Sequence, residues 1–231
     1  MSVIILSIII LIFSIIVHEY GHAWMANRLG DSTAKDLGRL TLNPIPHIDL
    51  FGSILLPLFF VLSGSGFLLA WAKPVPYNPN RIRDKKYGDL KVAIAGPGSN
   101  IIIAIIFGLL ARFLPITSEI KLSLLSSYLS GDNNLINSLI SGNLLNTIFL
   151  MAIIFCFLNL LLAIFNLIPV PPLDGSKILI NFLPERAKYK IFSIERYGMF
   201  IVLFLLMFGF FRLLLVPILY ILSILTGINI F

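Results

Sequence analysis

Residues 3–22 read VIILSIIILIFSIIVHEYGH, an apolar run followed at once by the pentapeptide His18-Glu19-Tyr20-Gly21-His22. Two histidines four positions apart lie on one face of an α-helix, so both imidazoles can bind one zinc ion. Glu19 lies one position along, near enough to take a proton from a water molecule that the metal activates. Because the motif ends a hydrophobic helix, the sequence predicts a metal site and hydrolytic chemistry at membrane depth.

The composition is that of an integral membrane protein. Of 231 residues, 58% are hydrophobic and only 12% are charged, about half the charged share of a typical globular protein. The net charge of +6 comes mainly from two basic loops, at 73–91 and 169–198. Basic loops between apolar segments follow the positive-inside rule, so both are expected to face the cytoplasm. We therefore expect a lipid bilayer and no nucleic acid as partner, and one membrane-embedded domain over 1–231.

Five apolar segments organise the chain, at 3–29, 51–71, 92–114, 144–168 and 199–225. Four of them are long enough to span a bilayer, and the first is expected to be retained because no signal-peptide cleavage site follows it. The segment 51–71 differs, because it contains Pro57 and a Ser63-Gly64-Ser65-Gly66 turn signal. The predicted fold is an all-α polytopic bundle of about four transmembrane helices plus a re-entrant membrane segment, with a β-hairpin as one form of that segment.

A catalytic zinc ion needs a third protein ligand, and Asp174 is the best-placed candidate. It follows the fourth apolar segment in Asn166-Leu167-Ile168-Pro169-Val170-Pro171-Pro172-Leu173-Asp174-Gly175. The prolines should end the helix near Ile168 and keep the chain extended, and Gly175 permits a sharp turn after the acid. The competing role is that of an N-cap for a helix that starts at Ser176, and one residue could serve both roles. His47, in a proline-broken loop, is expected to be a solvated or capping residue, with a role at the metal as the alternative.

Three asparagines in or beside apolar segments are candidates for supporting the site or binding substrate: Asn100, Asn159 and Asn166. Asn159 and Asn166 are seven positions apart and share a helical face. Amides in hydrocarbon usually bond to neighbouring helices, so structural roles compete with functional ones for all three. Asn166 is the candidate to contact substrate or Asp174.

Taken together, His18-Glu19-Tyr20-Gly21-His22, Asn166-Leu167-Ile168-Pro169 and Leu173-Asp174-Gly175 resemble the motifs of the site-2 protease family of intramembrane zinc proteases. Ala95-Gly96-Pro97-Gly98-Ser99-Asn100 is similar to that family's GPxxN motif. Ala72-Lys73-Pro74-Val75-Pro76 resembles its short prokaryotic branch, which lacks a PDZ domain.

The resemblance implies a zinc metalloendopeptidase that cuts peptide bonds within or near transmembrane segments. It implies one zinc ion on His18, His22 and Asp174, with Glu19 as general base. It also implies a transmembrane protein substrate, the plasma membrane of a prokaryote, and room for a regulatory membrane partner of unknown identity.

Two other classes of function fit parts of the pattern. A metal or ion transporter also places histidine and acid at membrane depth. However, the last three apolar segments contain no Asp or Glu that could continue an ion path across the bilayer. A catalytically silent binding scaffold would have no need of Glu19 beside both histidines.

The positions of the candidate metal ligands at the ends of two apolar segments predict how the chain crosses the membrane. His18 and His22 lie toward the end of the first helix, and Asp174 follows the end of the fourth segment. For these ends to meet, the two helices must cross the membrane in the same direction, so only one of the segments 51–71 and 92–114 can span. The break at Ser63–Gly66 assigns the re-entrant role to 51–71, with both chain termini outside the cell.

Overall fold

The computed structural model describes residues 3–55, 58–59, 62 and 73–230. These residues form helices and turns, and no strand occurs among them. In chain order, the helices are α1 (Val3–Arg28), α2 (Thr33–Asp36), the 3₁₀ helix η1 (Ile45–His47), the π-helix η2 (Leu50–Leu55), the 3₁₀ helix η3 (Pro79–Arg81), α4 (Gly88–Phe113), α5 (Ser118–Ser130), α6 (Asn133–Ile140), α7 (Leu144–Asn166), α8 (Asp174–Ile180), α9 (Glu185–Glu195), α10 (Gly198–Met207) and α11 (Phe210–Thr226).

Three helices, α1, α4 and α7, are long and apolar enough to cross a membrane. A helix of 26 residues such as α1 is about 39 Å long, more than the hydrocarbon core requires. Many large apolar side chains of α1 stay exposed, including Ile4, Ile5, Ile8, Ile9 and Ile12. Exposed apolar residues on a long helix are suited to contact with lipid, and the chain is a multi-pass membrane protein.

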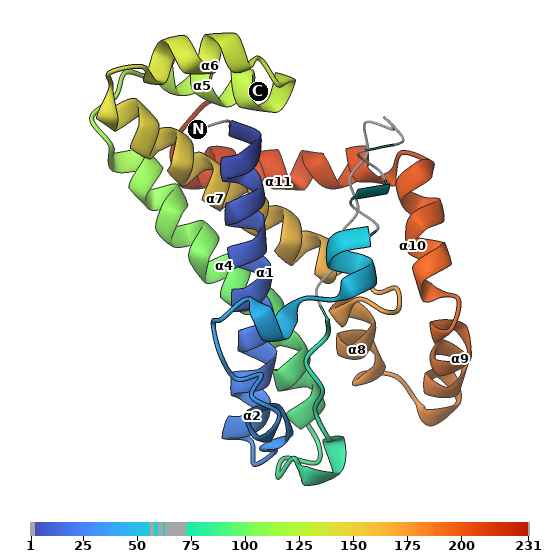
Figure 1. Ribbon diagram of the computed structural model, residues 1–231. Coiled ribbons are helices and arrows are strands. Elements are labelled where there is room, and N and C mark those ends of the chain that lie inside the picture. Colours follow the sequence, from blue (N-terminus) through green and yellow to red (C-terminus); the bar gives the residue numbers. More distant parts are fainter. Residues whose placement is uncertain (1–2, 56–57, 60–61, 63–72, 231) are drawn as a thin grey trace.

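The three long helices lie side by side and alternate in direction (Figure 1). Ser14 and His22 of α1 meet Asn100 and Val92 of α4 in reverse order, so α1 and α4 are antiparallel. The stacked pair Phe107 and Phe155 and the bonded pair Asn100 and Asn159 give the same result for α4 and α7. Therefore α1 and α7 run parallel, as the meeting of their C-terminal ends at one site requires.

The connection from α1 to α4 leaves and returns at the same end of the bundle. The Asn78 N–H donates to the Asp31 carboxylate at 2.6 Å, and the Arg83 N–H donates to the Leu29 carbonyl at 2.9 Å. This arrangement agrees with a segment 51–71 that does not cross. Most of that segment, including the turn signal Ser63–Gly66 and the proposed hairpin, lies outside the described residues.

The fifth apolar segment, 199–225, forms a bent pair of helices. α10 and α11 are inclined by 75° to one another. Gly209, between them, has φ of +81°, a left-handed conformation that ends a helix and favours glycine. With this pair counted as one span, the bundle has four spans in the described part of the chain.

The core forms where α7 packs between α4 and α11. α7 carries the most buried apolar side chains, including Phe149, Ile153 and Ile154, each fully buried. α5 and α6 cover the end of the bundle where α1 begins (Figure 1). There the buried Lys121 ammonium donates to the carbonyls of Ala111 and Arg112 at the end of α4. The opposite half of α1, which holds the two histidines, is left to form the site.

Candidate active site

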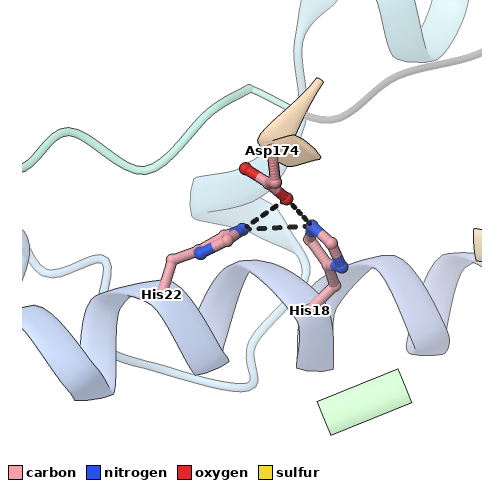
Figure 2. Close-up of side chains that lie close together, drawn as sticks. All are labelled: His18, His22 and Asp174. Carbon is pink, nitrogen blue, oxygen red and sulfur yellow. Dashed lines mark hydrogen bonds and ion pairs between the residues drawn. The ribbon is translucent and has the colours of Figure 1, made fainter. Parts of the chain in front are cut away.

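The side chains of His18, His22 and Asp174 converge on one point (Figure 2). The Nε2 atoms of the two histidines lie 3.1 Å apart, and each lies 3.1 Å from Oδ2 of Asp174. Both histidines extend from one face of α1, as their spacing predicts, while Asp174 begins α8. All three side chains are largely buried.

The donor set fits zinc. Two imidazole nitrogens and a carboxylate oxygen are ligands that catalytic zinc sites use, with a fourth position left for water or substrate. Three ligands of a tetrahedral ion with bonds of roughly 2.0–2.1 Å lie about 3.3 Å apart, close to the separations between these three atoms.

Hydrogen bonds to the other ring nitrogens settle which nitrogen can bind a metal. Nδ1 of His22 lies 2.7 Å from the carbonyl oxygen of Val92, which can only accept, so Nδ1 carries the proton. Nδ1 of His18 lies 2.7 Å from Oδ1 of Asn100. The amide of Asn100 is itself oriented, because its Nδ2 donates to the carbonyl of Ser14. Both histidines therefore present an unprotonated Nε2 to the common point, the tautomer a ligand requires.

Asn159 extends this support in the interior of the bundle. Its Oδ1 accepts from Asn100 and its Nδ2 donates to the hydroxyl of Ser14, both at 2.8 Å. Asn100 and Asn159 are fully buried, so this network joins α1, α4 and α7 behind His18. Asn166 lines the site cavity, and its amide donates to the carbonyl of Leu162. No hydrogen bond joins Asn166 to Asp174 in the described structure.

Ser14 and Gly96 are members of the site that sequence reasoning missed. Ser14 lies one helical turn before His18, on the same face, and this spacing is the signal that could have found it. Gly96 belongs to the Gly-Pro motif of α4, and a Cβ atom at Gly96 would lie 2.3 Å from Nε2 of His22 and 2.8 Å from Nε2 of His18. Only glycine leaves room for both imidazoles against this helix.

A compact turn between α7 and α8 places Asp174, so the predicted extended exit is wrong. α7 ends at Asn166, two residues before the expected end, and the Leu173 N–H donates to the Val170 carbonyl. α8 begins at Asp174 itself, with Leu173 as N-cap, and not at Ser176. Gly175 lies inside α8, where a Cβ atom would meet the Leu167 carbonyl oxygen at 2.3 Å. It allows a close approach of two helix ends, and no sharp turn occurs there.

Glu19 faces the same cavity as the three converging side chains. This cavity has a volume of about 120 Å³ and is also lined by Val75, Tyr77 and Lys177. Oε2 of Glu19 accepts a hydrogen bond of 2.9 Å from the N–H of Val75. The Lys177 ammonium lies 3.7 Å from the second oxygen of Asp174. The carboxylate of Glu19 and the ammonium of Lys177 therefore line the same cavity as the three converging side chains.

Tyr77 adds a neutral hydrogen-bond donor to the cavity. Burial, together with the negative charges of Asp89 and Asp174, raises the pKa of Tyr77 to about 12. Its phenol therefore stays protonated at neutral pH.

His47 is neither solvated nor part of the converging set. It is 2% exposed, its Nε2 lies 3.0 Å from the Thr41 carbonyl, and its Nδ1 has no partner among the described residues. Of the expected solvated or capping role, the solvated one is wrong, and the ring instead bonds a carbonyl of its own loop.

Comparison with known proteins gives the same class of protein as the geometry. Residues 6–209 match the model of Peptidase family M50. The chain is 36% identical over 204 residues to a protein of Bacillus subtilis (strain 168) named "Putative zinc metalloprotease YwhC", covering 87% of this chain and 81% of that protein.

A second relative, "Putative zinc metalloprotease Rip2" of Mycolicibacterium smegmatis, is 27% identical over 198 residues, covering 84% of this chain and 64% of the relative. No solved structure gives a significant match to the chain. The family match spans most of the chain and the first relative exceeds 30% identity, so the chain belongs to peptidase family M50, the site-2 protease family, and is a metalloprotease.

Proposed function

We propose that this metalloprotease is an intramembrane zinc endopeptidase that holds one zinc ion on His18, His22 and Asp174 and uses Glu19 as general base. The observation that carries the proposal is the convergence of two Nε2 atoms and a carboxylate oxygen at 3.1 Å separations beside Glu19. When bound, zinc supplies Lewis acidity toward the scissile carbonyl and toward water.

The residues of the chain supply the remaining chemistry. Glu19 accepts a proton from the attacking water and later donates it to the leaving amine, the role of a general base that becomes a general acid. Asn100 and the Val92 carbonyl keep the imidazoles of His18 and His22 in the tautomer and orientation required. The protonated phenol of Tyr77 is a donor available to negative charge that develops on the carbonyl oxygen.

The depth of the site supports cleavage within the membrane. His18 lies 15 residues into α1, or roughly 22 Å along the helix axis. The first four turns of α1, which precede His18, consist mainly of apolar residues. A peptide bond in a membrane helix has its carbonyl hydrogen-bonded and shielded by side chains, so the substrate must unwind locally before Glu19 and water can reach it. Substrates with Gly, Pro or Asn near the scissile bond should therefore be cut faster than uniformly helical ones.

Family membership and the site argue against the two other functions. A transporter needs polar groups along a path, and beyond Asp89 at the start of α4, the helices α4 and α7 hold no acid that could continue one from Asp174 across the bundle. A catalytically silent scaffold would not require Glu19 to face the site cavity. Proteolysis uses Glu19 together with His18, His22 and Asp174.

Reconstituted protein and a mapped cut site test the proposal. We expect purified protein in liposomes to cut a single-pass substrate that carries Gly-Pro within its transmembrane segment, with the cut mapped by mass spectrometry inside the membrane. A matched substrate with a Leu/Ala segment should be cut more slowly. Cuts confined to the soluble part of the substrate, or equal rates for the two substrates, would contradict intramembrane action on unwound helices.

A further inference from the structure

Arg39 is a buried cation outside the metal site and the substrate cavity. It is 9% exposed, and its Nη1 donates a hydrogen bond of 2.8 Å to the carbonyl of Pro74. No carboxylate pairs with it in the described residues. Burying a guanidinium without a carboxylate partner costs free energy. The hydrogen bond to the Pro74 carbonyl is the one that its side chain makes among the described residues, so we ask what this bond does.

The segment that Arg39 contacts is Lys73-Pro74-Val75-Pro76, here called the proline strap. Proline fixes its own φ and favours an extended conformation in the residue before it, so this strap is stiff. Proline also has no N–H, which leaves Val75 as the single donor between Pro74 and Pro76. That donor is the one bonded to Oε2 of Glu19.

Two further contacts hold the proline strap in register. The Lys73 N–H donates to the carbonyl of His47 at 2.9 Å. The side chain of Val75 is buried in a small apolar cluster with Ala23 and Ala34. Of these two contacts and the Arg39 hydrogen bond, the Arg39 hydrogen bond alone holds the peptide unit between Pro74 and Val75. The carbonyl that Arg39 binds belongs to the same peptide as the Val75 N–H.

We propose that Arg39 is a positioning residue for the general base: by holding the Pro74–Val75 peptide it aims the Val75 N–H at Glu19. With Oε2 held in this way, the rotation of the carboxylate is restricted and Oε1 is left to accept the proton of the attacking water. Misplacement of a catalytic group by about 1 Å can cost up to about 10²-fold in rate. The inference rests on the proposed role of Glu19.

The test uses full-length protein in detergent, with kinetics and with hydrogen–deuterium exchange resolved at the Val75 amide. Arg39→Met should lower kcat by about tenfold to 10²-fold with KM within about twofold, and should speed exchange at Val75. Arg39→Lys, which keeps a donor, should restore part of both. Lys35→Met removes an equal charge from an exposed position on α2 nearby and should behave as wild type.

The outcomes separate this inference from the proposed function. Wild-type kcat and wild-type exchange in Arg39→Met would overturn the inference, as would a fall in kcat without faster exchange at Val75. If Arg39→Met fails to retain its metal, Arg39→Gln, with a shorter donor, is read by the same criteria. A wild-type protein that cuts nothing would refute the proposed function, while the exchange at Val75 would still report whether Arg39 holds the peptide.

Discussion

Nδ1 of His18 in α1 lies 2.7 Å from Oδ1 of Asn100 in α4, so an amide on one helix fixes the tautomer of a histidine on its neighbour. Asn100 is in turn held by Ser14 and Asn159, which makes the orientation of the imidazole a property of the packed bundle. His18 and Asn100 are 82 residues apart in the chain, so the orientation of this imidazole depends on the packing of α1 against α4.

Asn100→Ala should lower zinc affinity by about 10- to 100-fold, because residues that orient metal-binding histidines commonly contribute that much. Titration against a fluorescent zinc chelator measures the effect. Asn146→Ala is the matched control, since Asn146 is also buried and bonds a carbonyl, that of Leu139, but lies away from the site. Equal affinities for the two variants would show that Asn100 does not orient His18 for the metal.

Gly96→Ala should abolish zinc binding while leaving the helix intact. A Cβ atom at this position would clash with Nε2 of both His18 and His22, yet alanine favours a helix more than glycine does. Gly98→Ala is the control, because nothing lies within 4 Å of a Cβ atom at Gly98. Metal analysis and circular dichroism on both variants check the prediction, and full zinc content in Gly96→Ala would show that the imidazoles do not pack against α4 in this way.

Asp31 should stabilise the fold in a pH-dependent manner. Burial alone raises the pKa of Asp31, but hydrogen bonds from Thr33 and the Asn78 N–H, with the charge of Arg81, outweigh it and hold the pKa below its ordinary value. A lowered pKa means that the charged form stabilises the fold above the ordinary carboxyl pKa of about 3.9, and that this stabilisation is lost as the pH falls through the lower folded value.

Asp31→Asn should therefore lower the melting temperature in detergent at pH 7, with a cost of about 1.5–3 kcal/mol for the hydrogen bonds to the charged group. The difference from wild type should shrink as the pH falls below about 4. Asp36→Asn, at an exposed position on the neighbouring helix, should change stability by less than about 0.5 kcal/mol. A difference between Asp31→Asn and wild type that grows at low pH would reverse the assigned sign.

Cysteine labelling in intact cells tests the topology, with Cys156→Ala as background. Probes at Ser32 and Asn80 should share the cytoplasmic side, because the Asp31–Asn78 hydrogen bond joins their loops. A probe at Asn133, the first residue of α6, should be external. Labelling of Ser32 and Asn80 from opposite sides would mean that the segment between them spans the membrane.

The convergence of His18, His22 and Asp174 and the helix directions could be predicted, because both follow from where the motifs lie along the chain. The spacing of His18 and His22 requires only helical geometry, and the parallel course of α1 and α7 follows from the requirement that their ends meet at Asp174. The family motifs gave the same set of residues.

The remaining features depend on contacts between segments distant in sequence. Nothing near Glu19 or Val75 in the sequence indicates that they bond, and the clash that requires Gly96 exists only once α1 and α4 are packed. The bend at Gly209 was not predicted because apolar length alone does not show where a helix breaks. The compact turn before Asp174 was missed because its prolines suggested an extended segment.

Glu19→Gln isolates the role of the general base, since glutamine keeps the shape of the side chain but cannot accept the proton of the attacking water. We expect purified Glu19→Gln to retain one zinc ion per chain and the wild-type melting temperature, while cleavage of a transmembrane substrate falls by about 10²–10⁴-fold. Near-wild-type turnover by zinc-loaded Glu19→Gln would show that Glu19 is not the general base and that another residue takes the proton.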